Sequence, residues 1–524
     1  MPPEALSGLT PNLPVLLQPL VPYLKAAWTQ HLAVLPVIVP MVLAPLSFLI
    51  NYRKASWAIA MAGSLATLFI SLLLIVQIHQ SGPVHYNLGG WAAPWGIAYD
   101  VRYLNTLLIL IVSLISSAAL AFALRSSSRD VSASKQGLFY TGWLILLTGL
   151  LGICLTGDAF NLFVFLEVSS LASYLLISLS KSRQGLVAAF QYLIMGTIGA
   201  SFILISIGLL YAITGTLNIA DLAQRLMVLE DSRTMVVAFA FLIVGVGIKA
   251  AIYPLHVWLP NAYTYAPSSV SVFLAGTSTK VAVYILLTFI FLLFGRHYSF
   301  AVIHIGWVLL PLAVIGIYLG SVAAISQVDV KRLLAFSSIA QIGYMVLGVA
   351  LNTQAGITAS TLHLFNHALI KSALFLAVGC MVYRLRAQKL RDLAGLAKVM
   401  PWSCGAFLLA GLSLIGLPGT AGFVSKWYLL IATWQSYGLW LCLVALASSL
   451  LAIIYIAKVC ERLYFGQRIS DDPVSEAPLS LLIPTWSLVL ANVYFGLYPE
   501  LPVFLAEQSS QQLLTVFNVN GQDQ

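Results

Sequence analysis

The chain has 524 residues, of which 60% are hydrophobic and only 8% are charged, and its formal net charge is +9. A water-soluble protein of this length needs far more charged surface, so the composition excludes that class and predicts an integral membrane protein. The positive charge could indicate nucleic-acid binding, but the basic residues stand in short loops between apolar runs. Membrane orientation explains that pattern better, and we expect no nucleic acid among the partners.

The apolar runs are long enough to cross a bilayer as helices of about 20 residues each. Residues 1–32 contain several prolines and are interpreted as an interfacial lead-in, without a removable signal peptide. Residues 78–102 are rich in Gly, Pro and aromatic residues and are interpreted as an interfacial loop. The sequence predicts about fourteen spans, at 33–50, 57–77, 103–124, 138–156, 159–180, 186–213, 235–258, 266–294, 301–326, 333–351, 359–383, 402–434, 439–465 and 477–500.

The Lys and Arg residues alternate between loops and predict the topology. Loops that follow odd-numbered spans hold 17 of them, whereas loops that follow even-numbered spans hold only 4. By the positive-inside rule the odd-numbered loops face the cytoplasm, so both termini face the other side of the membrane. We expect a multi-pass protein of the bacterial inner membrane.

Two spans carry the signature of a broken helix. Pro254 interrupts the seventh span, and Pro418 with its neighbouring glycines interrupts the twelfth. Paired interruptions of this kind point to a transporter site built on inverted repeats, although membrane helices also tolerate chance Gly and Pro. The two interrupted spans lie five apart, which predicts an all-α fold with two inverted five-helix repeats. The predicted domains are 1–137, 138–294 (first repeat), 295–465 (second repeat) and 466–524 (the last span and a C-terminal tail).

Four lysines and one glutamate lie in the interior of apolar spans, away from the span ends. Each lysine costs about 2.5–3.5 kcal/mol at a helix centre, and such residues usually mark ion or proton pathways. Burial disfavours an ammonium and a nearby carboxylate favours it, so a lysine can exchange a proton near neutral pH, whereas arginine stays charged. A snorkelling lysine or a static ion pair is the alternative. The residues are Lys249, Lys280, Lys371, Lys426 and Glu167.

The eleventh span carries a polar stripe. His363, His367 and Lys371 recur every four residues, on one face of a helix, over about 12 Å. Imidazole can accept and donate a proton near pH 7, so the stripe is interpreted as a proton relay. Static hydrogen bonding between helices is the alternative, and no Cys or carboxylate accompanies the pair to form a metal site.

Other sequence features argue against redox, nucleotide or metal chemistry in this chain. The five cysteines stand apart in apolar runs and form no C-x-x-C, and the sequence has no P-loop or dinucleotide-binding motif. We therefore expect no cofactor, no metal and no catalytic site in this chain. His256, at the end of the seventh span, is either a gate or a loop-packing residue.

Several segments resemble the proton-conducting membrane transporter family. This family comprises antiporter-like subunits of respiratory complex I, of membrane-bound hydrogenases and of Mrp-type cation/proton antiporters. The resemblance implies fourteen helices with two inverted repeats, a coupling pair Glu167/Lys249, a central relay at Lys280 and His363, and a terminal proton site at Lys426. Gln341 stands where many relatives carry His, so no relay role is implied there. The matching segments are FNLFVFLEVSSLASY, GIKAAIYPLHVWLPNAYTYAPSSVS, STKVAVY, DVKRLLAFSSIAQIGYM, HLFNHALIKSALF and GLPGTAGFVSKW.

Within this family the segments are most similar to the D-type subunits of Mrp antiporters and to their hydrogenase-associated relatives. The expected function is proton translocation within a multi-subunit Na⁺/H⁺ antiporter, together with other membrane subunits. The alternative is a proton-pumping subunit of complex I (NADH-quinone oxidoreductase) or of a membrane-bound hydrogenase. A self-sufficient solute transporter and a purely structural scaffold are less consistent with four buried lysines.

Overall fold

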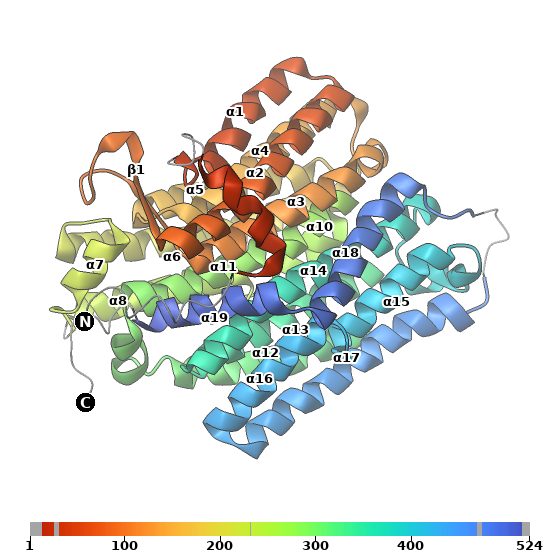
Figure 1. Ribbon diagram of the computed structural model, residues 1–524. Coiled ribbons are helices and arrows are strands. Elements are labelled where there is room, and N and C mark those ends of the chain that lie inside the picture. Colours follow the sequence, from red (N-terminus) through yellow and green to blue (C-terminus); the bar gives the residue numbers. More distant parts are fainter. Residues whose placement is uncertain (1–12, 26–30, 231, 469–473, 516–524) are drawn as a thin grey trace.

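The computed structural model describes residues 13–25, 31–230, 232–468 and 474–515. It is a bundle of helices with one small β-hairpin (Figure 1). The hairpin strands are β1 (Val84–Asn87) and β2 (Ala98–Val101). The helices are α1 (Leu35–Ile50), α2 (Arg53–Ser81), α3 (Tyr103–Asp130), α4 (Gln136–Leu155), α5 (Ala159–Ser178), α6 (Arg183–Thr214), α7 (Ile219–Leu226), α8 (Arg233–Ala250), α9 (Trp258–Tyr265), α10 (Ser268–Gly276), α11 (Ser278–Leu287), α12 (Gly306–Ser326), α13 (Val330–Ala350), α14 (Gln354–Leu385), α15 (Pro401–Ile415), α16 (Ala421–Tyr437), α17 (Leu439–Phe465), α18 (Leu479–Leu497) and α19 (Glu500–Thr515).

By length and composition, 12 helices in the described part of the chain can cross a membrane, or up to 13 if one bent pair is a single span. The other predicted spans coincide with shorter helices: α1 has 16 residues, and α15 and α16 have 15 and 17. A predominantly helical membrane fold is therefore confirmed, while the number fourteen and the repeats stay predictions.

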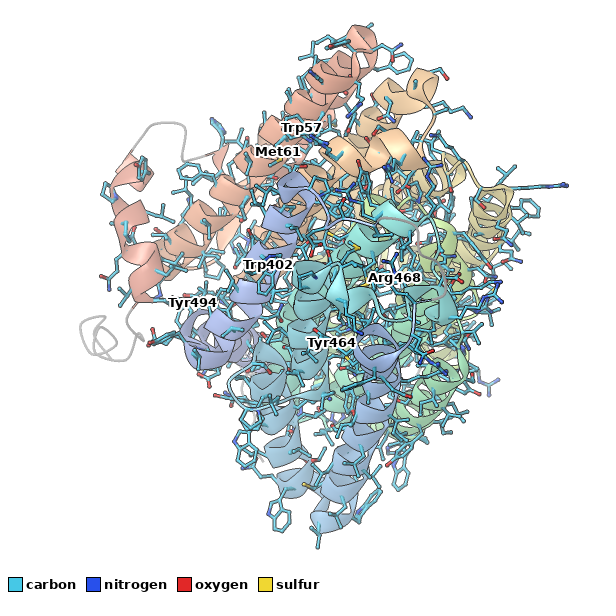
Figure 2. All side chains as sticks on the ribbon, turned by 90° about the vertical axis from the view of Figure 1, so that its right-hand side faces the viewer. Trp57, Met61, Trp402, Tyr464, Arg468 and Tyr494 are labelled. Atoms are coloured by element: carbon cyan, nitrogen blue, oxygen red, sulfur yellow. The ribbon has the colours of Figure 1, made fainter. Side chains whose placement is uncertain are left out.

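The helices divide into an inner and an outer set. The most apolar stretches of α4, α13 and the α10–α11 segment are 89–94% buried, and those of α6, α12 and α17 only 33–39%. α14 lies at the centre, where every residue from Gly356 to Met381 is buried. Large apolar side chains also lie exposed on the outside, among them Trp402 of α15 and Tyr494 of α18 (Figure 2). An apolar exterior around polar inner helices suits a bundle surrounded by lipid.

Both predicted helix breaks are confirmed. α8 ends at Ala250 and α9 begins at Trp258, with Pro254 in the turn between them, so the proline lies beyond the helix end rather than inside it. α15 ends at Ile415 and α16 begins at Ala421, with Pro418 between them. A third break at Thr277, between α10 and α11, is not predicted by the sequence, because that segment contains no proline.

Alternate loops meet at opposite ends of the bundle. At one end, backbone bridges join Tyr99 to Thr156 and Asp158 to Asn218; at the other, Val131 joins Ser180 and Asp329 joins Lys389. Each of these bridges joins two loops that both follow odd-numbered predicted spans or both follow even-numbered ones. We call the second end, which carries the odd-numbered loops and most Lys and Arg residues, the basic end.

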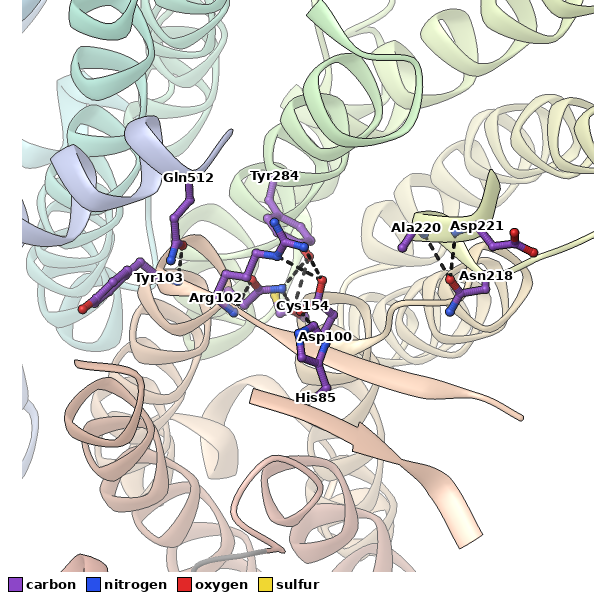
Figure 3. Close-up of polar contacts among 11 residues, drawn as sticks. His85, Asp100, Arg102, Tyr103, Cys154, Asn218, Ala220, Asp221, Tyr284 and Gln512 are labelled. Atoms are coloured by element: carbon purple, nitrogen blue, oxygen red, sulfur yellow. Dashed lines mark hydrogen bonds and ion pairs between the residues drawn. The ribbon is translucent and has the colours of Figure 1, made fainter. Parts of the chain in front are cut away.

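Polar contacts at the opposite end fasten the hairpin and α19 to the bundle (Figure 3). Asp100 lies 2.9 Å from Nη2 of Arg102 and 3.3 Å from Nδ1 of His85. The backbone N–H of Tyr103 donates to Oε1 of Gln512 in α19 at 3.0 Å. The sequence predicts only a tail after the last span, but α19 is a helix that packs against α3 and α14.

Candidate proton pathway

Glu167 and Lys249 form an ion pair within the bundle. Oε1 of Glu167 lies 3.6 Å from Nζ of Lys249, which also donates to Oγ of Ser170 at 2.8 Å. The side chain of Lys249 is 7% exposed and that of Glu167 is 27% exposed. α5 brings Glu167 to this place, and its start is fixed by Asp158, whose Oδ1 accepts from the backbone N–H of Asn161. Burial raises the pKa of that capping carboxyl, which lies before the span.

A cavity of about 30 Å³ lies beside this pair. It is lined by Ser170 and Lys249 on one side and by Ser278 and Val281 of α11 on the other. A cavity of this size with several hydroxyls can hold one or two waters. It therefore connects the ion pair to the helix that carries Lys280.

Lys280 lies in the first turn of α11, directly after the break at Thr277. Its Nζ donates to the backbone carbonyl of Ala275 in the last turn of α10 and lies 3.5 Å from Oγ1 of Thr279. The side chain is completely buried. The break thus supplies a carbonyl oxygen that an unbroken helix would use for itself.

Two histidines of α14 lie beside one another. The rings of His363 and His367 stack with centroids 5.7 Å apart, as the four-residue spacing predicts. Nε2 of His363 lies 3.0 Å from Oε1 of Gln341, and its Nδ1 lies 2.9 Å from Oγ of Ser425. Because the amide oxygen accepts, the network assigns the proton of a neutral His363 to Nε2. Within the described ranges, neither ring nitrogen of His367 has a hydrogen-bond partner.

Lys371 completes the stripe on α14. It is completely buried, and its Nζ donates to the carbonyl of Leu334 at 2.7 Å and to Oγ of Ser337. Both acceptors belong to α13. This environment excludes a snorkelling side chain, because Nζ points to a neighbouring helix and not to the end of its own.

Lys426 lies on α16, next to the α15–α16 break. Its Nζ donates to the carbonyl of Ile415, the last residue of α15, at 2.9 Å, and to Oγ of Ser449 at 3.3 Å. It also lies 5.1 Å from the ring centre of Tyr344. A cation over an aromatic ring and at a helix C-terminus is stabilised by both.

Lys249, Lys280 and Lys426 share one arrangement. Each lies at or donates to the C-terminal turn of a helix that is followed by a break: α8, α10 and α15. The partial negative charge of a helix C-terminus stabilises an ammonium. At Lys280 and Lys426 it does so with no carboxylate in ion-pair distance among the described residues, whereas Lys249 also has Glu167.

His256 lies in the turn between α8 and α9. Its ring stacks on Tyr253 with centroids 5.1 Å apart and lies 6.5 Å from Phe336. These contacts fit loop packing, and a gating role stays a hypothesis. In the part of the chain that the structure describes, no group of three or more His, Cys, Asp or Glu could hold a metal ion.

Sequence reasoning missed several partners in this pathway. Gln341, Ser425 and Tyr344 contact His363 or Lys426, and Lys331, which the sequence does not single out among the basic residues of the loops, is buried. Serine, glutamine and tyrosine are common in membrane helices, so only the three-dimensional contacts single them out. Lys331 lies in the first turn of its helix, where a surface position is the usual one.

These observations define a multi-span membrane protein with a buried axis of proton-titratable side chains. Residues 156–452 match the family model described as NADH:quinone oxidoreductase/Mrp antiporter, TM. The chain belongs to this family.

Two relatives and one solved structure illustrate its range. The chain is 39% identical to the N subunit of the NADH-quinone oxidoreductase of Desulforudis audaxviator, over 90% of this chain and 97% of the relative. It is 32% identical to the D subunit of the Na(+)/H(+) antiporter of Alkalihalophilus pseudofirmus, over 91% and 95%. A chain of the Mrp complex from Dietzia sp. DQ12-45-1b superposes with a TM-score of 0.84 at 25% identity, over 94% of this chain and 99% of that one.

Proposed function

We propose that this chain is the proton-translocating subunit of a multi-subunit monovalent cation (Na⁺)/proton antiporter. The observation that carries the proposal is the set of buried lysines at the C-termini of broken helices, together with two stacked, buried histidines of α14. The similarity to a chain of an Mrp complex, over nearly the whole of both chains, supports the antiporter as the host complex.

The proposed pathway runs from Glu167/Lys249 through Lys280 and the α14 stripe to Lys426. A proton that arrives at Glu167 removes the charge that holds Lys249 protonated, and Lys249 releases its proton into the adjoining cavity. A proton gained by Lys280 repels the positive charges farther along, because unit charges interact strongly in a low-dielectric interior. Among the described residues, Lys249 is the one of the four lysines with a carboxylate in ion-pair distance, so changes of charge at the others act on it through the low-dielectric interior.

The topology and domains are part of the same proposal. Residues 138–294 and 295–465 are two five-helix units of opposite orientation, each with one predicted proline break. The basic end faces the bacterial cytoplasm, and both termini face the other side of the inner membrane. Other membrane subunits of the complex supply the cation path or share it.

The test uses inverted membrane vesicles that contain the chain with its operon partners. A pH gradient is established, NaCl or KCl is added, and collapse of the gradient is followed in the wild type and in Lys249→Ala. We expect cation-dependent collapse in the wild type, slowed about tenfold or more by the substitution. A Lys249→Ala complex that assembles and exchanges at the wild-type rate would contradict the proposal.

The second candidate is a redox-driven pump that contains the same subunit. The 39% identity to the N subunit of an NADH-quinone oxidoreductase favours it. In that case NADH or a hydrogenase electron donor, and not Na⁺, changes the pH gradient in the same vesicles.

A further inference from the structure

A cavity of about 240 Å³ opens at the basic end, away from the pathway just described. It lies where the end of α3 and the α5–α6 turn meet the start of α10 and α13. Its lining is mostly polar and includes the charged residues Arg129, Asp130, Lys181 and Lys331. Such a cavity is accessible to water and to protons from one side of the membrane.

Lys331 forms the inner part of this cavity and is only 3% exposed. Its Nζ lies 3.3 Å from Oγ of Ser268 and 3.4 Å from the carbonyl of Ala266. In the described ranges, no carboxylate lies within ion-pair distance of it. The two nearby carboxyls accept from backbone N–H groups instead: Asp130 from Ser268 at 2.8 Å, and Asp329 from Arg332 at 3.1 Å.

Lys331 lies in the first turn of α13, and the acceptors of Lys371 follow it on the same helix. Leu334, whose carbonyl accepts from Nζ of Lys371, is three residues farther along α13, about 4.5 Å in rise. Ser337, the other acceptor, is six residues from Lys331, about 9 Å in rise. The first two turns of α13 therefore cover the depth between the cavity and the central stripe of α14.

Hydroxyls contact both lysines. Ser268 of α10 contacts Nζ of Lys331, and Ser337 of α13 accepts from Nζ of Lys371. Among the described residues, Oγ of Ser269 in α10 and Oγ of Ser372 in α14 are buried without a hydrogen-bond partner. Buried hydroxyls usually bind water, and water held among these serines can pass a proton from one lysine to the other.

We propose that Lys331 takes up protons from the basic end and delivers them to Lys371, and so to the central stripe. This inference rests on the proposed function and names the residue through which protons enter the pathway from the basic end. In each cycle the Lys331 ammonium loses one proton inward, through the hydroxyls, to the neutral amine of Lys371. The resulting neutral amine of Lys331 then regains one proton from water in the cavity.

A purely structural role would use the same contacts. Lys331 would then only clamp the first turn of α13 to the start of α10. Arginine separates the two roles, because it keeps the charge and the donors but does not release a proton. A matched control is Lys458, whose Nζ donates to the carbonyls of Ile325 and Gln327 at the same end, with no link to the central stripe.

The experiment compares Lys331→Gln, Lys331→Arg and Lys458→Gln in vesicles that contain the complete complex. Cation-dependent proton exchange is divided by the amount of assembled complex. We expect both Lys331 variants to lose about tenfold or more in rate, and Lys458→Gln to match the wild type. Ser337→Ala, which deletes only a hydroxyl, should also slow exchange while assembly is retained.

A wild-type rate in Lys331→Arg would show that charge and hydrogen bonding suffice, and would overturn the inference. If Lys331→Arg does not assemble, a wild-type rate in Ser337→Ala overturns it instead. The proposed antiporter function is contradicted by a different result, namely a wild-type complex that shows no cation-dependent proton exchange. In that event the same variants are compared for gradients built by NADH or a hydrogenase electron donor, where the access role predicts the same losses.

Discussion

The buried titratable residues differ in how completely their polar atoms are bonded. His363 has a partner on each ring nitrogen, whereas His367, one turn away and stacked on it, has none among the described residues. A buried polar atom without a partner costs about 1–3 kcal/mol. Stability therefore does not explain why a histidine stands at position 367, and the neighbouring lysines suggest a function in proton transfer.

We predict opposite effects of His367→Leu on stability and on transport. Leucine removes the unsatisfied nitrogens, so the thermal unfolding temperature of the purified complex should rise or stay unchanged. Proton exchange should fall by about tenfold or more, because a titratable group is lost. Both are measured on the same preparation.

His297→Leu is the matched control. His297 is exposed at the end of the bundle opposite the basic end, and its backbone is helical, with φ −59°, so leucine fits there without strain. Neither stability nor exchange should change in this variant. An unchanged exchange rate in His367→Leu would remove His367 from the pathway.

At the scale of elements, the helix breaks determine where the lysines find their acceptors. The α15–α16 break is closely packed: a Cβ on Gly422 would lie 1.8 Å from the carbonyl oxygen of Ser413. The backbone N–H of Gly422 also donates to Oγ of Ser413 at 3.2 Å. The absence of a side chain at residue 422 therefore keeps the start of α16 against α15, and Lys426 against Ile415.

Gly422→Ala should push the two half-helices apart. We expect less assembled complex and a lower unfolding temperature, measured by gel filtration and thermal unfolding. Gly208→Ala in α6 is the control, because nothing lies within 4 Å of a Cβ placed there. If the two variants assemble equally well and unfold at the same temperature, close packing of α15 against α16 at the break is not required for stability.

The sequence predicts some elements and misses others for physical reasons. Proline marks the breaks at residues 254 and 418, since it cannot continue a helix. The break at Thr277 has no such marker and depends on packing, because a Cβ on Gly276 would lie 2.4 Å from Oγ of Ser372. The short helix α7 and the polar helix α19 lack the long apolar run on which the prediction of spans depends.

For the whole molecule, apolar runs and basic loops suffice to predict a helical membrane bundle with alternating ends. The sequence also singles out Lys249 and Glu167, because a charged residue within an apolar run can be recognised without a structure. It could not place Gln341 against His363, or Leu334 against Lys371, because such contacts join different helices. The roles of the predicted site residues stay predictions until transport is measured.

α19 holds together parts of the bundle that are distant in sequence. Ser510 accepts from Oγ1 of Thr358 in α14 at 2.8 Å, and Gln512 accepts from the backbone of Tyr103 in α3. A chain that ends at Leu497 should therefore unfold at a lower temperature than one that ends at Thr515. The comparison by thermal unfolding in detergent would contradict the fastening role if the two curves coincide.

The partial exposure of Glu167 has a consequence for the life of the subunit before assembly. Its carboxylate reaches the outer surface of α5 near the middle of that helix, in a row with the exposed Phe160, Val164 and Leu171. Lipid around a charged carboxylate penalises the charge, and a newly made chain without neighbours meets lipid there. A newly made chain therefore has an unfavourable polar group on the lipid side of α5 until a neighbouring subunit of the complex covers that row.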